Sequence, residues 1–247
     1  MARSAAPRPL ICRGCWEQMR VPVPIRGPLA LPLRAFGIRR SGMHPHICTV
    51  CELMFGTVMR RRNVELDLTI LFADLRGFTA LSREVPAEGL REVLDFFYDH
   101  CAEAVWEEDG LLNKALGDGV LAVFNFPLSH PDHPRRAVRA AREIRRRCAE
   151  ACGPAAGRLG LDPARLGVGI GVHTGPTAFG EFGRLRREVT AIGSVVNLAA
   201  RLQGAAGAWE VLVSREVLDA AGADREVLGA RELELKGFAG PVAAFSV

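Results

Sequence analysis

The chain has 247 residues, 49% hydrophobic and 24% charged, which is ordinary for a globular protein and excludes overall disorder. The net charge is only +4, and the arginine clusters at 60–62 and 145–147 lack interleaved aromatic residues, so we expect no nucleic-acid binding. The most apolar long segment, 21–38, is interrupted by prolines and by Arg26 and Arg34. We therefore expect no membrane span, and the absence of a signal-peptide core predicts a cytoplasmic location.

Residues 1–59 differ from the rest, because they are rich in proline, glycine and arginine and lack a sustained helical or strand period. Two C-x-x-C pairs, Cys12/Cys15 and Cys48/Cys51, can supply the four thiolates of a tetrahedral zinc site. A segment with so few large apolar residues needs such an ion to fold. We predict a small zinc-ribbon or rubredoxin-like module held by structural Zn²⁺. Iron in the same site, or a disordered tail with incidental thiols, remains an alternative.

Two histidines in this segment, His44 and His46, could replace a cysteine ligand, but their position beside a proline predicts solvated side chains. Residues 51–63 have helical spacing. They are expected either to link the module to the main domain or to pack as the first helix of its core.

A second domain of the α+β class is predicted over residues 60–247. Apolar runs predict strands at 64–73, 111–116, 120–124, 166–173, 188–191 and 211–213. Helical spacing predicts helices at 86–109, 132–152 and 193–206. The order βαββαβ is that of a ferredoxin-like core, and residues 232–235 and 242–247 are expected to add a C-terminal β-hairpin.

Two aspartates stand beside glycine turns at the ends of apolar strands. Asp74 precedes the turn of LRGFT, and Asp118 lies between Gly117 and Gly119 in a tight hairpin. A carboxylate at the mouth of a buried strand must be solvated, paired or metal-bound. The pair therefore suggests a site for hard divalent cations that faces phosphate.

Lysine is rare in this chain. Of 32 Lys and Arg residues, only Lys114 and Lys236 are lysines, and both lie close to turn glycines. A lysine is a compact, strongly hydrated point charge, unlike the planar fork of arginine. Their positions favour a functional role over chance survival.

These segments resemble the catalytic domain of the class III nucleotidyl cyclases over about three quarters of the chain. The resemblance rests on five ordered blocks: FADLRGFT at 72–79, KALGDGVLAVF at 114–124, GIGVHTGP at 169–176, TAIGSVVNLAARL at 190–202 and LKGF at 235–238. It implies a phosphorus–oxygen lyase that makes a cyclic nucleotide for signal transduction.

The resemblance also implies two Mg²⁺ or Mn²⁺ ions per site, held by Asp74, Asp118 and the main-chain carbonyl of Leu75. Gly77, Phe78 and Thr79 would turn their N–H groups toward the triphosphate at a helix start. Lys236 matches a lysine that contacts the β- and γ-phosphates.

Base recognition in the family uses a lysine and a second polar residue, matched here by Lys114 and Thr190. Lysine at this position favours ATP over GTP, because guanylyl cyclases usually carry glutamate there. A threonine at the partner position resembles the bicarbonate-responsive subgroup of adenylyl cyclases, so bicarbonate is a possible regulatory ligand.

Asn197 and Arg201, four residues apart on one helix face, match the pair that orients the ribose and neutralises charge at the α-phosphate. In the family, the metal-binding and base-reading residues of one site come from different protomers. This chain has both sets and is expected to form a symmetric homodimer. The alternatives are a guanylyl or mixed-specificity cyclase, and a catalytically silent nucleotide-binding or dimerisation domain.

Some positions depart from the family pattern. Phe179 stands where small aliphatic residues are common and is expected to alter packing at the dimer seam. An arm carrying Arg184, Arg186 and Arg187 could reach phosphate or solvent. The three cysteines of the second domain, Cys101, Cys148 and Cys152, are expected to act as small apolar residues in the core. Asp132 is expected to cap the N-terminus of a helix. No catalytic role is expected for His130, His133 and His173.

Overall fold

The structure is a computed structural model that describes residues 9–61, 64–158, 162, 165–183, 185, 187–222 and 227–247. Of the arginines singled out above, Arg62, Arg184 and Arg186 lie outside the described residues.

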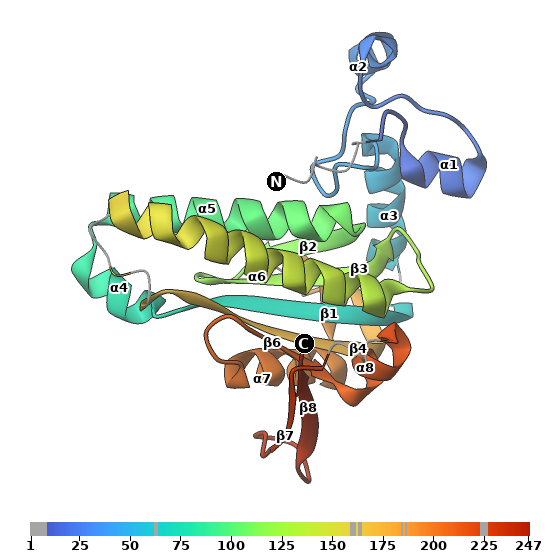
Figure 1. Cartoon of the computed structure of the whole chain (residues 1–247). Coiled ribbons are helices and arrows are strands. Elements are labelled where there is room, and N and C mark those ends of the chain that lie inside the picture. The colour runs from blue at the N-terminus through green and yellow to red at the C-terminus, as the bar shows by residue number, and fades with distance from the viewer. Residues whose placement is uncertain are drawn as a thin grey trace.

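One sheet of eight strands organises the described part of the chain (Figure 1). The strand order is β2-β3-β1-β4-β6-β8-β7, and β5 pairs with β4 off this path. All pairings are antiparallel except that of β4 with β6. The strands are β1 (Val64–Arg76), β2 (Gly110–Ala115), β3 (Gly119–Pro127), β4 (Gly167–Phe182), β5 (Glu188–Ile192), β6 (Glu210–Ser214), β7 (Gly229–Leu233) and β8 (Val242–Ser246).

The predicted α+β class and the βαββαβ order of the core are confirmed, as is the closing hairpin of β7 and β8. β4 extends beyond the predicted 166–173, because its second half pairs with the start of β1 and with β5. Helices α5 (Ala87–Glu107), α6 (His133–Arg158) and α7 (Ser194–Ala205) match the three predicted ones. Of the short helix α4 (Phe78–Glu84) only the start was predicted, and the short helix α8 (Arg215–Ala221) was not predicted at all.

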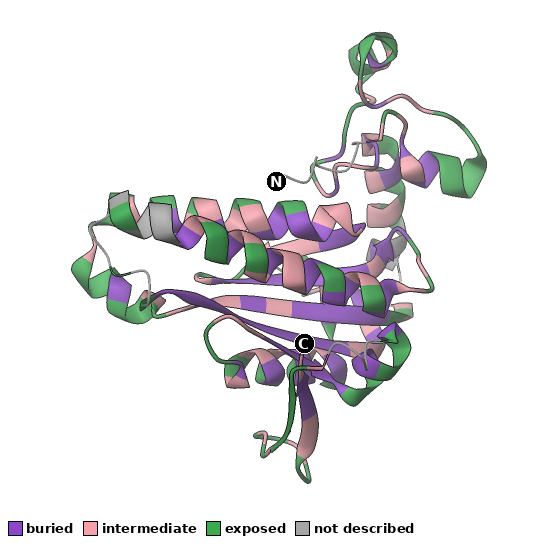
Figure 2. Cartoon of the chain, viewed as in Figure 1, coloured by how far each residue is buried: buried purple, intermediate pink, exposed green. Residues whose placement is uncertain are grey.

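The two faces of the sheet carry different helices. Leu71, Ala73 and Leu75 of β1 join the larger core under α5 and α6, which lie side by side in Figure 1. Leu68 and Ile70 face the other way and join a core with residues of α7. Because side chains alternate along a strand, the Asp74 side chain lies on the face that carries α7. Figure 2 shows the burial of β1, whose middle residues 68–71 are all buried, whereas buried and partly exposed residues alternate toward its C-terminal end.

Gly171 sets how closely α7 lies against the sheet. A Cβ atom at this position of β4 would lie 2.1 Å from the Gln203 nitrogen and 2.4 Å from the Ala199 carbonyl oxygen. Both atoms belong to the backbone of α7. Only glycine therefore permits this packing distance.

The N-terminal segment is ordered by short elements that its sequence did not predict, namely α1 (Arg13–Met19), the 3₁₀ helix η1 (Pro28–Ala30) and α2 (Leu31–Ala35). The predicted helix at 51–63 is confirmed as α3 (Thr49–Arg61). It serves both expected roles, because Cys51 belongs to the cysteine cluster and Met59 packs in the core beside α7.

Burial confirms some sequence assignments and corrects others. Cys101, Cys148 and Cys152 fill the core as predicted. Phe179 fills the core as well: it is fully buried within the chain, and its ring centroid lies 4.7 Å from that of Phe126. Its side chain therefore does not face a partner, and an effect on packing at a dimer seam stays a prediction. No helix among the described residues has the length and apolar character needed to cross a membrane.

Candidate active site

Asp74 and Asp118 come together where β1 ends and the β2–β3 turn begins. Asp74 is paired in register with Gly119, and the N–H of Leu75 donates to the Asp118 carbonyl at 2.9 Å. A Cβ atom on Gly119 would lie 2.9 Å from the Asp74 carboxylate, so glycine gives this side chain room. The two predicted metal-binding carboxylates are thus neighbours in one chain.

The charge of this pair is not fully compensated. Burial raises the pKa of Asp74, and the nearby Asp118 carboxylate raises it further, while Arg76 opposes both effects. Two crowded carboxylates are destabilised by their like charge unless a cation is present. The oxygen donors and their mutual repulsion therefore fit a hard divalent cation.

Arg76 is a residue of this site that sequence reasoning missed. Its guanidinium lies 3.5 Å from the Asp74 carboxylate and donates to the Gln203 carbonyl of α7. It occupies the space left by Gly169, where a Cβ atom would lie 2.3 Å from it. The glycine alternation of GVGIG was the available signal, but only the fold identifies what fills each gap.

Gly77 adopts the left-handed conformation (φ +82°) between β1 and α4, where a Cβ atom would also collide with the Arg165 carbonyl. Phe78 and Thr79 open α4, as expected from the sequence. Their N–H groups thus lie at a helix start, where the dipole favours anions.

Tyr98 on α5 supports the turn that carries Asp118. Its hydroxyl donates to the Gly117 carbonyl, one residue before the aspartate. Burial raises the pKa of Tyr98, and the charge of Asp118 adds to this effect. Tyr98 is the only tyrosine of the chain and was not identified from the sequence.

Lys114 and Thr190 lie on elements that touch. The Lys114 ammonium is 2.8 Å from a Glu188 carboxylate oxygen on β5, and the Asn113 amide donates to the Val189 carbonyl at 3.0 Å. Thr190 follows on β5, and its hydroxyl contacts the Ala191 carbonyl at 3.4 Å. The structure therefore brings the two predicted base-reading residues to one region and adds Glu188, which the sequence did not indicate.

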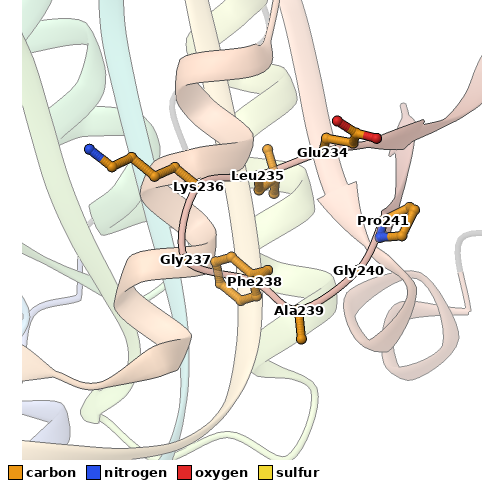
Figure 3. A pocket seen from close by; sticks show the side chains of 8 residues that line it. All are labelled: Glu234, Leu235, Lys236, Gly237, Phe238, Ala239, Gly240 and Pro241. Carbon is orange, nitrogen blue, oxygen red and sulfur yellow. The ribbon is translucent and has the colours of Figure 1, made fainter.

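Asn197 and Arg201 are exposed on α7, and Lys236 is exposed on the β7–β8 loop. Residues 234–241 of this loop line a hollow, and Figure 3 shows the Lys236 side chain extending away from the loop. In the described residues, no hydrogen bond or ion pair joins these three side chains to Asp74 or Asp118. The predicted residues thus fall into separate groups within one chain.

The four N-terminal cysteines form a buried cluster. Their Sγ atoms are separated by 3.6 Å (Cys12–Cys51), 3.5 Å (Cys15–Cys48) and 3.4 Å (Cys15–Cys51), and none forms a disulfide. Tetrahedral zinc with Zn–S bonds of about 2.3 Å requires sulfur separations of about 3.8 Å. The hydrogen bond from Cys12 lowers the pKa of Cys48 to about 5, so the cluster holds a thiolate at neutral pH.

Residues 62–246 match the family model of the adenylate and guanylate cyclase catalytic domain. The chain belongs to this family and contains a class III nucleotidyl cyclase catalytic domain. Adenylate cyclase 1 of Rhizobium meliloti is 34% identical over 139 residues, and an adenylate cyclase of Anabaena cylindrica is 30% identical over 138. Each match spans 56% of this chain but only 20% and 27% of the respective relatives.

Solved structures show the same fold. The guanylyl cyclase Cya2 is 33% identical with a TM-score of 0.69, and the match covers 75% of this chain and 93% of that one. The adenylyl cyclase CyaB from P. aeruginosa is 30% identical with a TM-score of 0.69, covering 75% and 95%. The family model begins at residue 62, after the cysteine cluster.

Proposed function

We propose that the chain is an adenylyl cyclase that converts ATP to 3′,5′-cyclic AMP and pyrophosphate. The observation that carries this proposal is the Asp74–Asp118 pair at the end of β1, combined with Lys114 on β2, the strand that leads into the turn of Asp118. The first feature supports phosphate chemistry with divalent ions, and the second supports recognition of adenine.

Lys114 favours adenine because an ammonium group only donates hydrogen bonds. The N1 atom of adenine is an acceptor, whereas N1 of guanine carries a proton. The Thr190 hydroxyl can accept a hydrogen bond from the exocyclic amine of adenine. In the free chain, Lys114 is paired with Glu188. When the nucleotide binds, Lys114 would give up this contact and donate to the base instead.

The same Glu188 supports the second candidate, a guanylyl or mixed-specificity cyclase. A carboxylate accepts hydrogen bonds from N1–H and the exocyclic amine of guanine. The likeness to a guanylyl cyclase structure supports this alternative too.

Asp74, Asp118 and the Leu75 carbonyl would hold two Mg²⁺ or Mn²⁺ ions, the metals that the family generally uses. When bound, these ions supply Lewis-acid stabilisation of the reacting oxygens and of the departing pyrophosphate. The N–H groups of Gly77, Phe78 and Thr79 and the Lys236 ammonium bind phosphate oxygens.

Cyclase catalytic domains bind a nucleotide substrate and function as dimers. In our proposal, Asn197 of one protomer orients the ribose, and Arg201 faces the charge that develops at the α-phosphate of the partner's site. The exposure of both residues on α7 supports this arrangement, because a second chain can then cover them.

We also propose that residues 1–59 form a separate module stapled by structural Zn²⁺ at Cys12, Cys15, Cys48 and Cys51, and that residues 60–247 form the catalytic domain. The sulfur separations support a tetrahedral metal site, and metal analysis of the purified chain would distinguish zinc from iron. Regulation by bicarbonate and a cytoplasmic location stay predictions from the sequence.

The proposed function is tested by measuring turnover of ATP and GTP side by side with Mn²⁺. We expect cyclic AMP as the main product. Asp74→Ala should abolish turnover while the chain still dimerises, and Glu65→Ala, an exposed carboxylate on the same strand, should be unaffected. Preferential turnover of GTP would establish the second candidate, and no turnover of either nucleotide would indicate a silent domain. Unchanged activity of Asp74→Ala would refute the metal assignment.

A further inference from the structure

A buried carboxylate, Asp109, joins the cysteine module to the catalytic domain. It follows α5, directly precedes β2, and is only 2% exposed. Its backbone is left-handed (φ +59°), which is uncommon for a residue other than glycine. Nothing in the sequence pattern indicated this position, because its partners come from distant segments.

Four basic or imidazole side chains converge on Asp109. Arg13 and His46 come from the module, and the His46 ring nitrogen lies 3.0 Å from the carboxylate. His130 and Arg136 come from the catalytic domain, and each lies 3.1 Å away. Burial raises the pKa of Asp109, but the His46 hydrogen bond and the Arg13 charge outweigh it and hold the pKa at about 2. The carboxylate is therefore ionised and paired from both sides.

The cysteine cluster fixes the two module partners of Asp109. Arg13 directly follows Cys12, and its backbone N–H donates to the His46 carbonyl at 2.9 Å. His46 stands two residues before Cys48, whose backbone N–H donates to the Cys12 sulfur at 3.1 Å. The positions of the Arg13 and His46 side chains thus depend on the cysteines being held together.

His44 lies beside these residues, and its environment shows that the expectation of solvated histidines was wrong. It is fully buried, and its Nδ1 accepts the His46 N–H at 3.2 Å. His46 is only partly exposed and is bound to Asp109. Neither ring is free in solvent.

These groups are close enough to hold a metal ion, since ligand atoms of His44, His46 and Asp109 lie within 4.8 Å of one another. Electrostatics argues against such a site. Two guanidiniums, Arg13 and Arg136, already pair with the single carboxylate, so a dication would meet a net positive environment. The cluster is better explained as an ionic joint between two parts of the chain.

The catalytic side of the joint leads to the base-reading residue. Asp109 is followed by Gly110, which opens β2 and lies against the Phe124 ring, where a Cβ atom would come within 2.5 Å. The same short strand carries Asn113 and Lys114, which contact β5. Asp109 thus anchors the start of the strand on which Lys114 lies.

We propose that the cysteine module makes the cyclase responsive to a thiophilic metal ion. With the ion bound to the four cysteines, Arg13 and His46 stay on Asp109 and hold β2, and with it Lys114, in the position that binds the purine. Without the ion, the two side chains separate from Asp109 and nucleotide binding weakens. This inference rests on the proposed cyclase function.

The test compares the zinc-loaded full chain with the same chain after treatment with a nitrogen-donor chelator selective for Zn²⁺, at saturating Mg²⁺. We expect zinc removal to lower kcat/KM for ATP at least about fivefold, mainly through KM, and zinc addition to restore it. Arg13→Gln should keep its zinc but respond less than about twofold. Arg13→Lys keeps the charge and should retain part of the response.

A matched control is Glu108→Gln, which removes the exposed ion pair with Arg139 one residue before Asp109 and should respond like the wild type. A second readout does not depend on turnover. Because coupling between the affinities of two sites is reciprocal, an ATP analogue that cannot be cyclised should tighten zinc binding (lower its Kd) in the wild type but not in Arg13→Gln.

Turnover that does not depend on zinc, together with a zinc Kd that does not depend on the ATP analogue, would overturn this regulation while leaving the cyclase intact. A full zinc response in Arg13→Gln would overturn the role of the joint. A chain that cyclises neither ATP nor GTP in any metal state would instead overturn the proposed function.

Discussion

The spacing between α7 and the sheet should control catalysis, and Gly171→Ala tests this directly. The added Cβ atom would lie 2.1 Å from the Gln203 backbone nitrogen, whereas ordinary contacts begin at 3.4 Å. The difference, 3.4 minus 2.1 Å, means that α7 must move by about 1.3 Å, since backbone cannot rotate away as a side chain can. Overpacking of this kind typically costs about 1–3 kcal/mol.

The displacement matters because α7 carries Asn197 and Arg201. A misplacement of about 1 Å can lower the rate about 100-fold. A domain with a stability of about 5–15 kcal/mol tolerates the folding cost, so Gly171→Ala should remain folded. We expect kcat to fall about 100-fold while the Kd of an ATP analogue changes little, because Asp74, Asp118 and Lys114 lie on other elements.

Gly204→Ala is the matched control, because it adds the same methyl group to α7 itself. Nothing lies within 4 Å of a Cβ atom at this position. It should keep full activity and gain up to about 1 kcal/mol of stability from the better helix propensity of alanine. Wild-type kcat in folded Gly171→Ala, measured by steady-state kinetics beside thermal unfolding, would refute the proposed role of the α7 position.

Three further predictions follow from single contacts. Arg76→Gln removes the guanidinium that connects the Asp74 carboxylate to the Gln203 carbonyl. We expect the dependence of turnover on Mn²⁺ concentration to change while Tm stays nearly the same, and a variant with the same Mn²⁺ dependence as the wild type would contradict this. Tyr98→Phe removes one hydrogen bond, worth about 1 kcal/mol, and should raise the apparent KM for the divalent ion about fivefold; an unchanged KM would exclude support of the Asp118 turn. Burial lowers the pKa of His44 from 6.5 to about 3, so the ring stays neutral in the folded chain while it gains a proton below pH 6.5 in the unfolded chain. The folded state therefore loses stability as the pH falls from 6.5 toward 3. Unfolding experiments should therefore show a loss of about 2 kcal/mol at pH 5 in the wild type beyond that in His44→Gln, and equal losses in both would refute the assignment.

The parts of the fold that follow local patterns were predictable. Apolar runs and glycine turns predicted β1, the β2–β3 hairpin and the neighbouring positions of Asp74 and Asp118. Helix α8 was missed because it has only seven residues, although Ser214 caps its first turn. Short helices have too little periodicity to distinguish them from turns.

The ion pairs and hydrogen bonds that connect distant elements were not predictable. Arg13 and Asp109 are 96 residues apart, and Arg76 and Gln203 are 127 apart, so no local spacing relates them. The full burial of Phe179 was not predicted and His44 was wrongly expected to be solvated for the same reason, since burial depends on which distant segments cover these residues.

The sequence by itself determined the chemistry that this chain carries: two carboxylates beside glycine turns, two lysines, an Asn/Arg pair on one helix face and four paired cysteines. These are local properties, fixed by side-chain type and by the periods of strand and helix. Only the tertiary structure decided which of these groups contact one another. The partners of Asp109, the guanidinium beside Gly169 and the helix beside Gly171 all come from distant segments, so they are defined only once those segments pack together.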